Sequence, residues 1–163
     1  MNNIFKIFFL ITLVSAILLA IVIYNDKKFK NNPLSKQVKT KLYIKNEQIK
    51  QKIKEIYNID FKVPLIISDD LHNNLFGLTS YKKAQISIIL NKKRFQENEN
   101  YMINSVLPHE YAHALMFHFG DFTKINGGHT KKWQEFCLNI GGNKCDRFVG
   151  HNDILIEKLG VIN

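Results

Sequence analysis

Residues 7–24, IFFLITLVSAILLAIVIY, form a run of 18 residues without a charge. A helix of this length is about 27 Å long, close to the roughly 30 Å hydrocarbon core of a bilayer. The run is apolar on every face, whereas a surface helix of a soluble domain is apolar along one stripe. The sequence therefore predicts one transmembrane helix, within an N-terminal anchor at residues 1–25.

A cleaved signal peptide is the competing interpretation of this run. Lys6 would supply its basic segment and Ala16 would end the cleavage site. Cleavage there would leave the apolar segment ILLAIVIY at the new N-terminus. The apolar segment of a signal peptide is also shorter, about 7–15 residues. We therefore favour a retained anchor and a single-pass protein of the cell membrane.

The net charge of +9 is concentrated next to the anchor. Residues 26–41 carry six lysines against Asp26, a net charge of +5, whereas residues 42–163 carry only +3. The basic segment is typical either of a juxtamembrane linker that contacts anionic headgroups or of a solvated linker. Because the excess charge lies outside the domain, nucleic acid is not an expected partner. Lysines that follow a span also predict a domain on the cytoplasmic side.

The segment 42–163 is long enough for one domain, and its periodicity predicts an α+β fold. An amphipathic helix ends by Asn58. Three strand-like segments follow, at residues 61–68, 75–81 and 84–91. We expect them to form a small antiparallel sheet. Two further helices are predicted, one closed by Gly120 and one over residues 129–140.

The motif H-E-x-x-H lies in the first of these two helices, at His109, Glu110 and His113. Residues four apart on a helix differ by about 40° in direction, so both imidazoles can reach one ion. The glutamate points elsewhere and can accept a proton from a water on the metal, whose pKa zinc brings towards about 7. Pro108 either begins this helix or joins two helical segments at a kink.

A catalytic zinc site needs a third protein ligand, and several residues are candidates. His118 lies about 180° around the same helix from His109 and so points away from the metal. His129 follows Gly127 and Gly128, which let the chain fold back towards the motif. Glu135 is the rival, because two-histidine zinc sites also take a downstream glutamate. The loop geometry favours His129.

The segments LPHEYAHALMF and GGHTKKWQEF together resemble the SprT-like metallopeptidase family. Members of that family show H-E-x-x-H followed by a histidine and, four residues later, a tryptophan or similar aromatic residue. The resemblance covers about residues 42–151 and extends to the glycine-bearing segment FGLTSYKKAQISIILN. It implies a zincin-like fold in which His109, His113 and His129 hold Zn²⁺ and Glu110 is the general base.

The best-understood eukaryotic members of that family degrade proteins crosslinked to DNA. Many members also carry a C-terminal zinc ribbon, whereas here no cysteine pairs follow Cys145, and a membrane anchor is not part of the usual pattern. These differences, with the modest charge of the domain, disfavour a role on DNA. Cys137 and Cys145 are either free thiols or one disulfide, and two cysteines do not identify the compartment.

Four other residues near the motifs have a structural and a functional interpretation. Trp133 is expected in the core, although it could line a substrate cleft. Tyr111 is expected to point away from the metal, although it could steady an oxyanion. Arg147 and His151 are expected to solvate the tail, although they could face the cleft.

The sequence thus predicts a membrane-tethered zinc metallopeptidase that hydrolyses protein or peptide substrates. The alternative is a non-catalytic, zinc-stabilised interaction module at the membrane. A purely structural zinc site needs a fourth ligand and no base, so the presence of Glu110 favours the enzyme.

Overall fold

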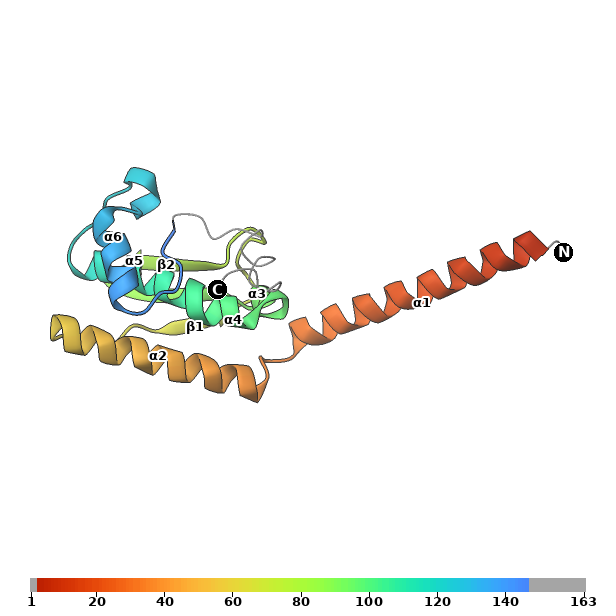
Figure 1. Cartoon of the computed structure of the whole chain (residues 1–163), viewed down its shortest axis with the longest axis horizontal. Helices are drawn as coiled ribbons and strands as arrows, with labels where there is room; N and C mark the ends of the chain where they lie inside the picture. Colours follow the sequence, from red (N-terminus) through yellow and green to blue (C-terminus); the bar gives the residue numbers. More distant parts are fainter. Residues whose placement is uncertain (1–2, 147–163) are drawn as a thin grey trace. The chain divides into compact units, whose positions relative to one another are not determined.

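The structure, a computed structural model, describes residues 3–146. The chain divides into two units, Met1–Leu34 and Ser35–Asn163. Arg147 and His151, for which the sequence left two interpretations, lie outside the described residues. The first unit contains one long helix, and the second contains the sheet, the remaining helices and the H-E-x-x-H motif (Figure 1).

Helix α1, Asn3–Asn31, contains the apolar run and buries none of its residues. Its apolar window has a mean hydropathy of 2.9, so the helix is long and apolar enough to cross a membrane, as a signal sequence also is. The helix continues past residue 25, into the segment predicted as a linker. Lysine is a good helix former, and an ion pair between Lys30 and Asp26 (2.8 Å) supports this last part of α1.

Helix α2, Lys36–Tyr57, begins and ends at side chains suited to those positions. Ser35 caps its N-terminus by accepting a hydrogen bond from the Val38 amide (3.2 Å). Asn58 ends it in the left-handed conformation, with φ of 56°. The predicted end of this amphipathic helix is therefore confirmed, and most of residues 26–41, the segment predicted as a basic linker, is helical.

The sheet has three strands, β1 (Leu65–Ser68), β2 (Gly77–Lys82) and β3 (Gln85–Asn91), in the order β1-β3-β2. β2 and β3 form an antiparallel hairpin, whereas β1 pairs with β3 in parallel. The prediction of an antiparallel sheet is therefore wrong for β1. β3, in the central position, is the most buried of the three strands, and its Ile88 and Leu90 are fully buried. β2 is left with one edge that pairs with no other strand of the described chain.

The helical region that carries the motif is continuous, with a change of winding before Pro108. It runs through α4 (Glu99–Tyr101), the π-helical turn η1 (Met102–Val106) and α5 (Leu107–His118), and the extended residue Asn98 separates it from the preceding helix α3, Lys92–Glu97. Proline has no N–H for the carbonyl of Asn104, four residues earlier. That carbonyl instead accepts a hydrogen bond from the Asn143 amide (3.4 Å). Pro108 thus lies in the first turn of α5, and a π-helical turn directly precedes this helix, so each of the two arrangements considered from the sequence is met in part.

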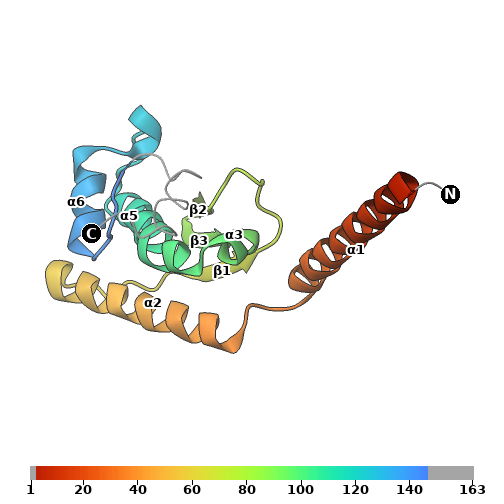
Figure 2. The same ribbon diagram turned by 45° about the vertical axis from the view of Figure 1, so that its right-hand side comes forward.

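Helix α5 is central to the domain, because it packs against β2, β3 and α6, Lys131–Asn139 (Figure 1 and Figure 2). It is also tied to α2, since the buried Tyr111 hydroxyl donates a hydrogen bond to Asn46 Oδ1 (2.7 Å). Tyr111 therefore points away from the metal motif, as predicted. A disulfide joins Cys137, on α6, to Cys145, in the segment that follows α6. Of the two states that the sequence left open for these cysteines, the structure therefore has the disulfide.

Candidate metal centre

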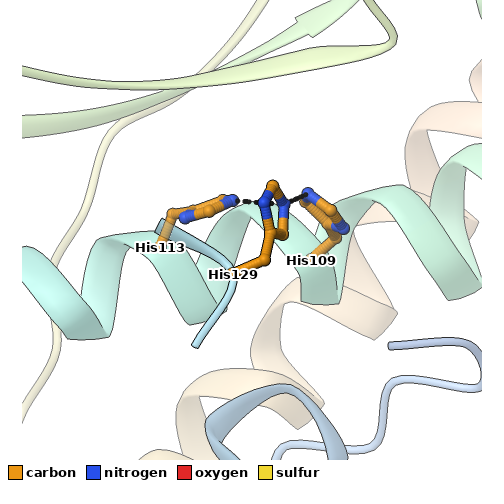
Figure 3. A group of neighbouring side chains, drawn as sticks. All are labelled: His109, His113 and His129. Carbon is orange, nitrogen blue, oxygen red and sulfur yellow. Dashed lines mark hydrogen bonds between the residues drawn. The ribbon is translucent and has the colours of Figure 1, made fainter. Parts of the chain in front are cut away.

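Three histidines from two segments of the chain converge on one point. His109 and His113 lie one turn apart on α5, and His129 lies in the α5–α6 loop, residues 119–130. The Nε2 atom of His129 is 3.1 Å from Nε2 of His113 and 3.1 Å from Nε2 of His109. Figure 3 shows the three imidazoles facing one another. The potential ligand atoms all lie within 4.8 Å, so the group is positioned to bind a metal ion.

The spacing of the three nitrogens fits a metal better than it fits hydrogen bonds alone. Two nitrogens held at about 2.05 Å from a tetrahedral zinc ion are about 3.3 Å apart, close to the two observed separations. Without a metal, Nε2 of His129 can donate to only one of its two neighbours. Imidazole nitrogens suit zinc, copper, iron and nickel, so the donor set alone does not identify the ion.

Burial keeps the His109 and His113 imidazoles in the neutral form that binds metals. Desolvation lowers the pKa of His109 well below its ordinary value, and repulsion from His113 and then His129 lowers it further. The same causes, burial first and His129 second, bring the pKa of His113 to about 4. A ligand that is already deprotonated at neutral pH releases no proton when the metal binds, so the site is prepared for a cation.

The α5–α6 loop reaches back to α5 because glycines allow it to turn. Gly127 and Gly128 have φ of 66° and 83°, a region that favours glycine. A Cβ on Gly128 would lie 3.5 Å from the His113 ring, so the loop backbone rests directly on that ligand. Thr130 then caps α6 by accepting a hydrogen bond from the Trp133 amide (3.3 Å). The last predicted helix therefore begins at Lys131 rather than at His129.

Trp133 forms a wall behind the three ligands. Its side chain is 1% exposed, which confirms the prediction that it belongs to the core. Its ring centroid is 4.7 Å from that of His109, 5.4 Å from His113 and 4.5 Å from His129. Because one rigid indole contacts all three imidazoles, it limits their rotation and keeps their Nε2 atoms close to one another.

Glu110 is buried between α5 and β2. Its side chain is held by Thr79, whose hydroxyl lies 2.7 Å from Oε2 and 2.8 Å from the Glu110 carbonyl oxygen. Desolvation raises the pKa of Glu110 to about 7, although the Thr79 hydroxyl acts in the opposite direction. A Cβ at Gly77 would lie 2.7 Å from Oε1, so the carboxyl group occupies space that only a glycine leaves open. Two residues of β2 thus set the position of this carboxyl group.

The structure separates the remaining candidates from this cluster. Glu135 lies exposed on α6, and it is not among the residues grouped around His129. The His118 ring packs against Phe61, with centroids 5.2 Å apart, on the side of α5 away from the ligands. The contribution of Gly77 and Thr79 was missed by the sequence analysis. The alternation of a strand places these two residues on one face, but nothing in the sequence showed that this face meets Glu110.

Comparison with known proteins supports the resemblance seen in the sequence. Residues 40–152 match the model of the SprT-like family. No curated protein and no solved structure matches the chain. The matched segment includes the three histidines, Glu110, and the β2 residues that contact its carboxyl group.

Removal of one imidazole from the cluster is expected to abolish stable metal binding. His113→Ala and His129→Ala should each weaken binding of a divalent metal by more than about 100-fold, since loss of an outer-shell partner alone costs about 10- to 100-fold. Metal content by plasma mass spectrometry and calorimetric titration of the full-length protein measure this.

His118→Ala and Glu135→Ala are the matched controls for this measurement, and both should keep the metal. Full metal content in His129→Ala would contradict the assignment. Loss of metal in Glu135→Ala would make that carboxylate the third ligand.

Proposed function

The chain belongs to the SprT-like family, and from this premise we propose that it is a membrane-tethered, zinc-dependent peptidase that hydrolyses protein substrates. His109, His113 and His129 would hold the ion, and Glu110 would act as the general base. Zinc is the proposed metal because a set of three histidines is one of the ligand sets of catalytic zinc sites.

The observation that carries this proposal is a cluster of three histidines together with a buried carboxyl group, that of Glu110, on the residue next to His109 in the same helix. A structural zinc site is closed by four protein ligands, whereas a catalytic site has three and keeps one position for water or substrate. Within residues 3–146 the cluster contains three histidines and no fourth ligand. Burial of the Glu110 carboxyl group destabilises the fold, and a purely structural zinc site would not need this group.

The residues of the chain divide the proposed reaction between them. When bound, zinc would lower the pKa of a water molecule to about 7 and polarise the peptide carbonyl. Glu110 accepts the proton of the attacking water and passes it to the nitrogen of the leaving amine. The Thr79 hydroxyl and the space at Gly77 hold the carboxyl group in one orientation during these transfers.

The proposed location is the membrane, with α1 as a single-pass anchor. Two features bear on the side that the domain occupies, and they point in opposite directions. The lysines after the apolar run predict the cytoplasmic side, whereas a disulfide such as Cys137–Cys145 is typical of an oxidising compartment. Alkylation of thiols in intact cells decides between them, because only a cytoplasmic pair would be reduced.

Replacement of the proposed base should separate metal binding from hydrolysis. In Glu110→Gln the three imidazoles are unchanged, so the zinc content should stay at about one ion per chain. The rate of hydrolysis of an unfolded protein substrate should fall by about 100- to 10,000-fold, the range that general base catalysis contributes. Zinc content and cleavage of denatured casein by the full-length protein measure the two effects.

The same variant tests the alternative, a non-catalytic interaction module that zinc stabilises. Such a module would bind its partner equally well with Glu110 or glutamine and would cleave nothing in either form. A pull-down from intact cells with Glu110→Gln would retain an uncleaved substrate if the protein is a peptidase. Cleavage at the wild-type rate by Glu110→Gln would remove the glutamate from the mechanism.

Thr79 is proposed as a positioning residue that acts through Glu110. Thr79→Val removes the hydroxyl and keeps the shape of the side chain, so zinc content and KM should change little. The value of kcat should fall about 10- to 100-fold, because a hydrogen bond to a charged group contributes about 1.5–3 kcal/mol. Steady-state kinetics on a peptide substrate measure the two parameters.

The control is Thr79→Ser, which keeps the hydroxyl and should restore most of kcat. If Thr79→Val and Thr79→Ser lower kcat equally, the hydroxyl does not position the base and the methyl group is what matters.

A further inference from the structure

A cavity of about 400 Å³ lies directly beside the metal centre, and one of the ligands, His113, forms part of its wall. Its other walls come from the end of β2, the last turns of α5 and the α5–α6 loop. The large apolar side chains that line it are Tyr81, Met116, Phe117 and Phe122. We call this cavity the aromatic pocket.

Three rings of the aromatic pocket are arranged as one cluster. The centroids of Tyr81 and Phe122 are 4.9 Å apart, and those of Phe117 and Phe122, which stack, are 5.5 Å apart. Tyr81 and Phe122 nevertheless remain 46% and 49% exposed. Apolar surface that stays in contact with water next to a functional group is typical of a binding site.

The polar residues of the pocket favour an uncharged ligand. Asp121 and Lys124 contribute one negative and one positive charge at its edge. The Asp121 carboxylate accepts a hydrogen bond from the Thr123 amide (3.1 Å) and forms an ion pair with Lys132 (3.8 Å). The walls therefore offer aromatic faces without a net charge, which suits an apolar side chain better than a lysine or a glutamate.

We propose that the aromatic pocket binds a large apolar side chain, such as phenylalanine or leucine, of the substrate residue next to the cleaved bond. This inference rests on the proposed peptidase function. Its volume lies at the small end of the range of about 300–1,000 Å³ for ligand pockets, so it accommodates one side chain rather than a peptide segment. His113 belongs both to the metal centre and to the wall of the pocket. A substrate whose carbonyl lies at the metal centre therefore has the neighbouring side chain close to the pocket.

The strand and the loop that form the aromatic pocket also contact residues of the proposed catalytic site. Tyr81 lies on the same face of β2 as Gly77 and Thr79, which contact the Glu110 carboxyl group. Gly128, whose backbone rests on His113, also lines the pocket. One strand and one loop thus contribute both to the site of cleavage and to the recognition of the side chain beside it.

Two zinc-binding hydroxamic acids that differ in their side chain test this inference without any hydrolysis. The probes are 3-phenylpropanohydroxamic acid and acetohydroxamic acid, titrated calorimetrically into the zinc-loaded full-length protein. The phenyl compound should bind roughly 10- to 100-fold more tightly, which corresponds to burial of one large apolar side chain. Phe122→Ala should reduce this preference by about 10-fold, because it removes a wall of the pocket.

Ile125→Ala is the matched control, since Ile125 is an exposed apolar residue of the same loop that does not line the pocket. It should leave the preference unchanged. Equal affinity for the two compounds, or an unchanged preference in Phe122→Ala, would overturn the aromatic pocket and leave the peptidase proposal standing. Failure of both compounds to bind the zinc-loaded protein would instead overturn the proposed catalytic site, together with the inference that rests on it.

Discussion

The burial of His109 and Glu110 on one helix, with His113 half-buried one turn further along, is the constraint on which the rest of the domain depends. Polar groups in a core cost free energy unless they find partners there. β2 supplies Thr79 and the space at Gly77 for the carboxyl group, and the α5–α6 loop, with Trp133 of α6, completes the surroundings of the imidazoles. β2 and α6, both of which pack on α5, therefore also contribute side chains or space to the surroundings of the motif.

Much of the site could be predicted, because the information is local. A spacing of four residues places two histidines on one helical face, and the glycines before His129 let the loop return. The partners of Glu110 could not be predicted, since Thr79 lies 31 residues earlier and meets it only through tertiary packing. The parallel pairing of β1 was missed for the same reason, because the partner and the direction of a strand depend on tertiary packing and not on chain order.

The N-terminal apolar helix and the domain depend on different properties of the sequence. The run in α1 needs only length and hydropathy, so it was predicted from composition, although the helix extends through the lysines as far as Asn31. In the domain, one chain segment serves several purposes. The α5–α6 loop carries His129, rests on His113 through Gly128 and contributes Phe122 to the aromatic pocket. A change in this loop is therefore expected to alter metal affinity and substrate preference together.

The most direct test of the account is X-ray absorption spectroscopy at the zinc edge of the full-length, zinc-loaded protein. Three imidazoles and one water predict four nitrogen or oxygen neighbours at about 2.0–2.1 Å, with the scattering pattern of three histidine rings and no sulfur. In His129→Ala, the signal of the zinc that remains bound should lose one ring. Four protein ligands, or a sulfur neighbour at about 2.3 Å, would contradict a catalytic centre built on these three histidines.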